Sequence, residues 1–267
     1  MAASEKKKLL EVRGLTMDFG GLRAIDNVGL DIHAGEIVAL IGPNGAGKTT
    51  FFNCVTGIYT PTSGDVLIHP PHGQTRRING MKPNSITELG MARTFQNIRL
   101  FPAMTVLENV MIGRHCRTRT NMLDVIFGGA KVRREERETV EKSYQLLKKV
   151  GLAQVANEYS RNLSYGAQRR LEIARALATD PFLLLLDEPA AGMNPQETLE
   201  LDELIARIRA EGEVAILLIE HDMKLVMNIS DRIYVMEYGK EIANGTPREI
   251  KENPRVIEAY LGEDAHA

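Results

Sequence analysis

Short apolar runs alternate along the chain with segments in which apolar residues recur at every third or fourth position. The runs at residues 37–41, 182–186 and 214–219 have the length and composition of buried strands. Between the last two runs, residues 196–210 place leucine and isoleucine on one side of a helix and charged residues on the other. The alternation therefore predicts an α/β fold, with a mostly parallel sheet covered by helices.

Three other segments have patterns of their own. Residues 9–32 alternate between apolar and polar positions around the turn-like sequence Phe19-Gly20-Gly21, which favours an antiparallel hairpin or small sheet over a helix. Residues 69–86 are rich in proline, glycine and asparagine, which predicts an exposed loop. Residues 131–149 mix charges of both signs and predict a solvent-facing helix with internal ion pairs rather than a dedicated binding surface.

The composition excludes several classes of protein. The chain has 267 residues, 43% hydrophobic and 25% charged, and its net charge of −2 gives no electrostatic signature of nucleic-acid binding. No apolar run approaches the roughly 18 residues that span a bilayer, and the lysine-rich start lacks the apolar segment of a signal peptide. Cys54 and Cys116 share no motif spacing with each other or with the histidines, so we expect reduced thiols. The chain has no internal repeat, which excludes two copies of one unit within it.

The sequence after the first buried strand fits the pattern G-x-x-x-x-G-K-[ST] in full. Its members are Gly42, Pro43, Asn44, Gly45, Ala46, Gly47, Lys48 and Thr49, and Thr50 follows them into a predicted helix. In such a loop, backbone N–H groups converge on phosphate oxygens while the helix directs its positive end at the same anion. Lys48 is placed to neutralise the β- and γ-phosphates of ATP, and the Thr49 hydroxyl to bind Mg²⁺. The pattern alone predicts a nucleoside-triphosphate site, which kinases, GTPases, helicases and transporters share.

Two adjacent acids follow the second buried strand. Asp187 and Glu188 come directly after four leucines, and ligands in open α/β sheets gather at the carboxyl ends of strands. Because burying a carboxylate without a partner is costly, a metal ion is a simple reason for their position. We expect Asp187 to hold Mg²⁺ through its water shell and Glu188 to orient and deprotonate the attacking water. Two solvent-exposed acids at a strand end are the alternative.

Between these two motifs, residues 162–170 read Asn-Leu-Ser-Tyr-Gly-Ala-Gln-Arg-Arg and precede an amphipathic helix, for which Ser164 is a suitable N-cap. This sequence resembles the signature sequence of ABC ATPases. The resemblance implies that Ser164 and Gly166 bind the γ-phosphate held by a second subunit. Such a role suits a helix N-terminus, where N–H groups and the helix dipole favour a polyanion. A capped structural helix is the alternative.

Four further segments carry the same resemblance. Gln96 matches the Q-loop glutamine, which senses Mg²⁺ and the attacking water and adjoins the permease contact. His221 matches the switch histidine that reads the γ-phosphate. Residues 191–194 look like the D-loop, which crosses the dimer interface. Phe19 matches the aromatic residue that stacks on adenine, with a place in the hairpin core as its alternative.

The resemblance covers residues 9–263 and implies a single ABC ATPase domain. The implied fold is α/β, with a P-loop (RecA-like) nucleotide core, an N-terminal antiparallel β subdomain and an inserted α-helical subdomain at about residues 100–165. Residues 1–8 and 264–267 are expected to be flexible termini. Three positions depart from the family pattern. Tyr165 and Ala167 replace a glycine and a glutamine of the signature, and Asn194 stands where aspartate is usual, but none of these changes removes a catalytic group.

Several local phrases are similar to the larger ATP-binding subunit of bacterial importers for branched-chain amino acids. These phrases lie at residues 93–101, 187–195, 219–227 and 259–262, and residues 121–136 resemble an insertion of that subfamily. The solute rests on family likeness alone, since this subunit does not touch it. Systems for urea or short-chain amide uptake and for lipopolysaccharide export are alternatives.

The resemblance implies an ATPase that closes as a dimer on ATP and Mg²⁺ and so drives a membrane permease. The expected partners are a second ABC ATPase subunit, two transmembrane permease subunits and, indirectly, an external solute-binding protein, with no nucleic acid. The second ATPase is expected to be a different, smaller chain, with a homodimer possible in isolation. The expected location is the cytoplasmic face of the plasma membrane. The rival classes are a non-transport ABC ATPase and an ordinary P-loop kinase or GTPase, but the chain lacks coiled-coil insertions, a second cassette and an Asn-Lys-x-Asp motif.

Overall fold

The computed structural model describes residues 6–117, 130–212 and 214–264. Within these residues, the larger of two sheets has the strand order β10-β9-β3-β8-β7-β6. Its strands are β3 (Ile37–Ile41), β6 (Met91–Arg93), β7 (Leu183–Asp187), β8 (Ala215–Ile219), β9 (Arg232–Glu237) and β10 (Lys240–Gly245). All neighbouring strands run parallel except β10, which pairs antiparallel with β9. The three apolar runs form β3, β7 and β8, and every residue of these strands is buried.

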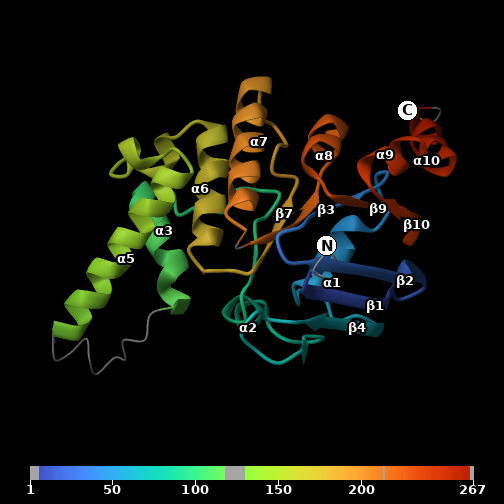
Figure 1. The fold of residues 1–267 in the computed structure, drawn as a ribbon, viewed down its shortest axis with the longest axis horizontal. Coiled ribbons are helices and arrows are strands. Elements are labelled where there is room, and N and C mark those ends of the chain that lie inside the picture. Colours follow the sequence, from blue (N-terminus) through green and yellow to red (C-terminus); the bar gives the residue numbers. More distant parts are fainter. Residues whose placement is uncertain (1–5, 118–129, 213, 265–267) are drawn as a thin grey trace, which may run out of the picture.

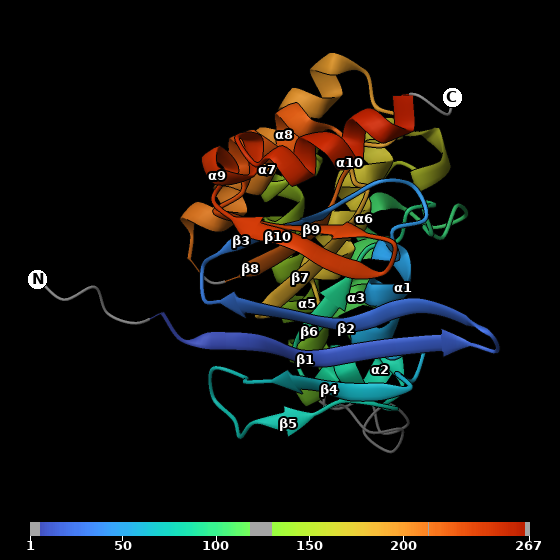
Figure 2. The ribbon, with the colours of Figure 1, turned by 90° about the vertical axis from the view of Figure 1, so that its right-hand side faces the viewer.

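A second, antiparallel sheet comes from the amino-terminal part of the chain and has the order β2-β1-β4-β5. Its strands are β1 (Lys8–Phe19), β2 (Leu22–His33), β4 (Ser63–Ile68) and β5 (Arg76–Arg77). Figure 2 shows this sheet in blue and teal beneath the larger one. β1 and β2 form the predicted hairpin, which closes where Phe19 lies opposite Leu22.

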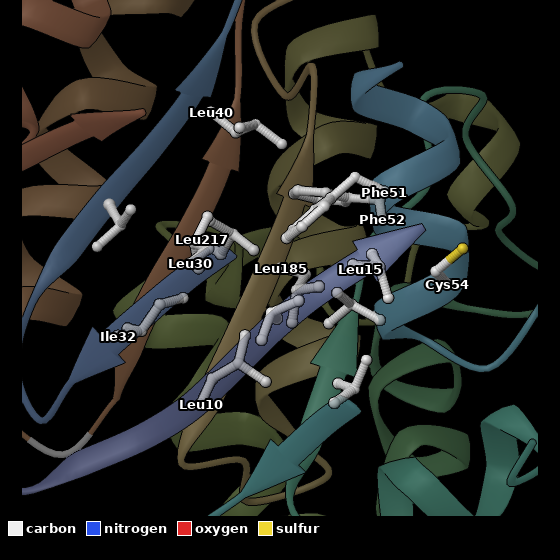
Figure 3. Packing of buried hydrophobic residues seen from close by; sticks show 14 of the residues in the cluster. Leu10, Leu15, Leu30, Ile32, Leu40, Phe51, Phe52, Cys54, Leu185 and Leu217 are labelled. Atoms are coloured by element: carbon white, nitrogen blue, oxygen red, sulfur yellow. The ribbon is translucent and has the colours of Figure 1, made fainter. Parts of the chain in front are cut away.

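The central strands of the larger sheet direct alternate side chains into two cores. Leu185 of β7 packs with the small sheet and with α1 (Lys48–Val55), whereas Leu184 packs with helices on the opposite face. Figure 3 shows the first core, in which Phe51 and Phe52 of α1 lie among leucines from both sheets. Because α1 is held between the two sheets, the loop that precedes it is fixed in place.

Helices cover the opposite face of the larger sheet (Figure 1). They are α6 (Tyr165–Leu177), α7 (Pro195–Ala210), α8 (Met223–Ile229), α9 (Pro247–Lys251) and α10 (Pro254–Asp264). The leucine and isoleucine positions that predicted α7 are its buried residues: Leu201, Leu204, Ile205 and Ile208. The period of the sequence therefore gives the face by which this helix packs.

A helical region extends from α6 to one side of the molecule, at the left of Figure 1. Its elements are α3 (Val106–Arg114), the 3₁₀ turn η1 (His115–Arg117), α5 (Ala130–Lys149), and the 3₁₀ turns η2 (Ala153–Val155) and η3 (Ser160–Asn162). Val110 of α3 and Leu147 of α5 are buried in the same core as α6. The rest of α5 is largely exposed, with an ion pair between Arg134 and Glu138 at 2.9 Å. Part of the insertion expected at 121–136 lies outside the described residues. Within the described part, no helix is both long enough and apolar enough to cross a membrane.

The structure differs from the sequence-based expectations at two places. The range 69–86 is not an exposed loop throughout, because it contains β5 and the start of α2 (Pro83–Glu88). Ile78 and Ile86 in this range are buried in the core beneath the small sheet, and the surrounding prolines and glycines hide that role in the sequence. At the amino-terminal end, Lys8 begins β1 and the carbonyl oxygen of Lys7 accepts a hydrogen bond from the Ala34 amide, so these two residues are ordered rather than flexible.

Candidate functional site

The predicted phosphate loop connects β3 to α1, and its glycines are required by the backbone around them. A Cβ atom at Gly42 would lie 2.0 Å from the carbonyl oxygen of Met236, and one at Gly47 would lie 2.7 Å from that of Ala24. Gly47 also has a φ of 100°, a conformation that side chains other than hydrogen disfavour. The Gly239 amide donates to the carbonyl oxygen of Ala46 at 3.0 Å. The loop is therefore held closely against β2 and the turn between β9 and β10.

Lys48, the first residue of α1, is buried within this loop. Its Nζ donates hydrogen bonds to the carbonyl oxygens of Gly42, at 2.6 Å, and Pro43, at 2.8 Å. The ammonium group thus lies on the inner side of the curve that the loop makes. A cation in that position can meet the terminal phosphates of a nucleotide bound in the loop.

A pocket of about 560 Å³ opens beside the loop. It is lined by residues 44–50 together with Phe19, Leu22, Arg23, Ala24, Glu188, His221, Tyr238 and Gly239. Glu188 and His221 come from the ends of β7 and β8, which are far from the loop in sequence. The sheet therefore brings the predicted loop, the predicted base and the predicted switch histidine to one cavity. Tyr238, an exposed residue with a φ of 46°, lines the same wall and carried no sequence signal.

Phe19 lies at the end of β1 with 42% of its surface exposed. Its ring packs edge-on against Tyr59, with the ring centres 5.3 Å apart and the planes at 80°. One side of Phe19 is thus supported while the residue lines the pocket. An exposed aromatic ring in this position suits stacking on a nucleotide base, and its role toward adenine stays a prediction.

Glu188 is the centre of a polar cluster assembled from three segments. Its Oε1 lies 2.7 Å from Nε2 of His221, and its Oε2 accepts a hydrogen bond of 2.7 Å from Nε2 of Gln96. Glu188 has a φ of 47°, and its amide donates to the carbonyl oxygen of Ile219 at the end of β8. The strained backbone turns the side chain away from the buried strand and toward the pocket. Gln96, the predicted sensor of the attacking water, and His221, the predicted sensor of the γ-phosphate, thus both contact the predicted base Glu188.

Asp187 is buried, with 3% of its surface exposed, and does not line the pocket. Its Oδ2 accepts a hydrogen bond of 2.6 Å from Nη2 of Arg93 on β6. The guanidinium of Arg93 also donates to Asn53 and Thr56 of the α1 region. This ion pair was missed from the sequence, where Arg93 appeared only within a phrase of family likeness. The signal in the sequence was Asp187 itself, because an aspartate at the end of a buried strand needs a cation nearby.

A second missed residue is Glu220, which joins the turn after β7 to the turn after β8. Its Oε1 accepts from the Ala190 amide at 2.7 Å, and its Oε2 accepts from the His221 amide at 3.0 Å. Burial raises the pKa of this carboxyl group, and the backbone N–H donors oppose that shift. Glu220 therefore couples Ala190, next to the predicted D-loop, to the backbone of the predicted switch histidine.

The predicted signature residues lie away from the pocket of their own chain. Ser164 is the N-cap of α6, and its Oγ accepts a hydrogen bond of 3.3 Å from the Ala167 amide. The Gly166 amide donates to Oε1 of Glu197 on α7 at 3.1 Å. Ser164 is exposed while Gly166 is buried, so this helix end is only partly open to a partner.

The three departures from the family pattern have local explanations. Tyr165 fills the space beside Gly192, where an added Cβ would lie 3.3 Å from its ring. Ala167 is buried in the helical core. Asn194 is the N-cap of α7 and forms a capping box with Glu197, a task that asparagine and aspartate perform equally well.

Comparison with known proteins decides the family. A model of the family described as ABC transporter matches residues 25–191, more than half of the chain. The chain belongs to this family. A second family model, for the branched-chain amino acid ATP-binding cassette transporter, matches residues 240–266 of the cassette.

The high-affinity branched-chain amino acid transport ATP-binding protein LivG of Escherichia coli (strain K12) is 52% identical to the cassette over 255 residues, which cover 96% of this chain and 98% of LivG. The crystal structure of the ADP conformation of MJ1267, an ATP-binding cassette of an ABC transporter, is 32% identical. It superposes with a TM-score of 0.81 and covers 96% of this chain and 99% of its own. A dimeric cassette, MJ0796 in a post-hydrolysis state with ADP and phosphate, is 26% identical with a TM-score of 0.73, and covers 90% of this chain and 99% of its own.

These findings confirm the predicted α/β fold of an ABC cassette and the predicted family. The cassette is an ATPase of ABC transporters and binds nucleotide. An ordinary P-loop kinase or GTPase is excluded, because the match includes the whole stretch from the phosphate loop through the signature to Asp187.

Proposed function

We propose that the chain is the ATP-hydrolysing subunit of an importer for branched-chain amino acids. The observation that carries the hydrolytic part is the contact of Glu188 with both Gln96 and His221 beside the phosphate loop. The solute is supported by 52% identity to LivG over nearly the whole of both chains, and by the family match at residues 240–266.

The chain's own groups divide the work of hydrolysis. Backbone N–H groups of the phosphate loop and the ammonium of Lys48 hold the phosphates of ATP. Glu188 accepts a proton from the attacking water, and its two carboxylate oxygens are oriented by separate partners, Gln96 and His221. In this structure both oxygens are already hydrogen-bonded, so an attacking water would displace or share one of these bonds.

The residues present fit a magnesium ion. Thr49 lines the pocket. Asp187, the last residue of β7, lies at the same end of the sheet but outside the pocket lining, with its Oδ2 bonded to Arg93. Mg²⁺ keeps several waters and needs few protein oxygens, so a hydroxyl, a carboxylate reached through water and the amide of Gln96 are a sufficient set. The ion would neutralise the charge that develops on the phosphates. A metal site built from three or more His, Cys, Asp or Glu side chains is a different kind of site, and none occurs among the described residues.

The position of the signature supports a site shared between two subunits. Ser164 and Gly166 lie apart from the chain's own pocket, on a helix end that suits a phosphate held by a partner. We propose a second ABC ATPase subunit, a different and smaller chain in the cell, and two permease subunits served by an external binding protein. The assembly would sit at the cytoplasmic face of the plasma membrane. Urea or short-chain amide uptake and lipopolysaccharide export remain the alternative transport systems.

The hydrolytic proposal is tested by Glu188→Gln. The amide keeps the shape of the side chain but cannot accept the proton, so turnover should fall by roughly 100-fold or more. ATP binding should persist, and the variant should accumulate as an ATP-dependent dimer in size-exclusion chromatography with light scattering. Glu138→Gln on the exposed face of α5 is the matched control and should hydrolyse ATP normally. Near-normal turnover by Glu188→Gln would remove the residue from its role.

The solute is tested in the complete transporter. The chain is co-purified with its permease and reconstituted, and ATP hydrolysis is measured with the binding protein and leucine, isoleucine or valine. Stimulation by these amino acids but not by urea or short-chain amides is expected. Stimulation by one of the other solutes would retain the ATPase and reassign the importer.

A further inference from the structure

The signature helix α6 carries a row of charged residues that hold the backbone of the Q-loop. Arg169, Glu172 and Arg175 are spaced three residues apart, which places them along one side of the helix. The segment they contact, residues 95–99, follows β6 and includes Gln96. Both Arg169 and Glu172 are only 2% exposed.

Arg169 contacts two successive carbonyl groups of this segment. Its Nη1 donates to the carbonyl oxygen of Phe95 at 2.8 Å, and its Nη2 donates to that of Gln96. The planar guanidinium suits this fork-like contact, which a lysine could not reproduce. Nη2 also donates to the hydroxyl of Tyr165 at 3.1 Å, one turn earlier in α6.

Glu172 and Arg175 complete the attachment. Glu172 accepts a hydrogen bond of 3.2 Å from the Arg99 amide and forms an ion pair of 3.4 Å with Arg169. Arg175 donates to the carbonyl oxygen of Arg99. Both ends of the segment are thus fixed to α6, and the buried charges compensate one another.

The side chain of Gln96 in turn donates to Glu188 at 2.7 Å. Arg169 itself does not line the nucleotide pocket. We propose that Arg169 is a positioning residue for hydrolysis, which holds the Gln96 backbone so that its amide reaches Glu188. Tyr165, which stands where the family signature has glycine, supports Arg169 in this position. The inference rests on the proposed role of Glu188 and Gln96.

The consequence is a specific kinetic signature. Arg169→Met should lower kcat by roughly tenfold or more, because a shift of Gln96 by a fraction of its hydrogen-bond length misplaces the groups around the water. The KM for ATP should change by less than about threefold, since the phosphate loop keeps its contacts. Arg170→Met is the matched control, because the neighbouring Arg170 pairs instead with Glu200 of α7 and should leave both constants unchanged.

A double-mutant cycle with Gln96→Ala separates positioning from a general effect on the fold. If Arg169 acts through Gln96, adding Arg169→Met to Gln96→Ala should change kcat by less than about twofold. If Arg169 serves only the packing of α6, its full effect should appear again in the Gln96→Ala background. That additive result would overturn the proposal.

Arg169→Met leaves a buried glutamate with one partner fewer, so each variant is checked by thermal unfolding. If Arg169→Met fails to fold, Tyr165→Phe takes its place in the cycle, because Tyr165 is 42% exposed and the change removes only a hydroxyl group. Tyr165→Phe should lower kcat by about fivefold, because it removes one hydrogen bond. Added to Gln96→Ala, it should lower kcat no further. Turnover by the wild-type transporter that Glu188→Gln abolishes would retain the proposed function whatever the cycle gives. A complete transporter without any ATP turnover would contradict the proposed function itself.

Discussion

The N-termini of α1 and α6 are both expected to bind phosphate, but their first backbone amides have different hydrogen-bond partners. The N-cap of α1 is Gly47, which offers no side-chain cap to the first amides of the helix. The N-cap of α6 is Ser164, whose hydroxyl accepts from the Ala167 amide, and the preceding amide, that of Gly166, donates to Glu197. One helix end faces a pocket of its own chain, and the other is satisfied internally.

This difference in hydrogen bonding indicates what each helix end needs in order to bind phosphate. The α1 end can accept a phosphate directly, because the loop and Lys48 surround the place where it binds. In the proposed shared site, the α6 end would have to exchange the carboxylate of Glu197 for the phosphate of a partner. On this proposal a nucleotide binds to one chain, whereas completion of the hydrolytic site needs two. Three variants break or sharpen this comparison.

The largest effect is expected at the α1 end. Lys48→Ala removes a charge-assisted contact worth roughly 3 kcal/mol and should weaken ATP binding by about 100-fold. Isothermal titration of the single chain measures this loss. Lys224→Ala, at an exposed lysine of α8, is the charge-matched control and should bind ATP as the wild type does. Unchanged affinity for Lys48→Ala would refute the assignment of the loop.

A different kind of loss is expected at the α6 end. The Cβ of Gly166→Ala would lie 2.6 Å from the carboxyl group of Glu197 and would block close approach to the helix end. Hydrolysis should fall by roughly 100-fold, as for loss of a donor that stabilises the transition state, while the single chain still binds ATP. Gly29→Ala on β2, where an added methyl has ordinary contacts, is the control. Parallel loss of ATP binding and hydrolysis would mean that α6 serves its own chain.

The smallest effect concerns the exchange at Glu197. Glu197→Gln keeps a hydrogen-bond acceptor beside Gly166 but removes the charge, and hydrogen bonds to charged groups are stronger by about 1 kcal/mol. The ATP concentration for half-maximal dimer formation should fall by about fivefold, measured by light scattering in the Glu188→Gln background. Glu200→Gln, one turn further along α7, should leave it unchanged. An unaltered midpoint in Glu197→Gln would show that the carboxylate does not compete with phosphate.

Much of the fold and site follows from local patterns. The strands β3, β7 and β8 lie within one residue of the apolar runs, because a continuous buried strand leaves a continuous apolar sequence. The phosphate loop was complete in the sequence, since its chemistry depends on neighbours along the chain. Glu188 was predicted from its place at the end of a buried strand, and Gln96 and His221 from family likeness. In the structure both Gln96 and His221 contact Glu188.

The sequence by itself determined the alternation of strands and helices, the phosphate loop and the identity of the acidic and histidine residues at the strand ends. Only the tertiary structure decided which groups these residues contact: Arg93 on Asp187, Glu197 on Gly166 and Arg169 on the Gln96 backbone. The physical reason is the sequence separation of the residues in contact. Periodicity and motif spacing report contacts within one element, whereas the partner of a buried charge depends on which distant segments the sheet brings side by side.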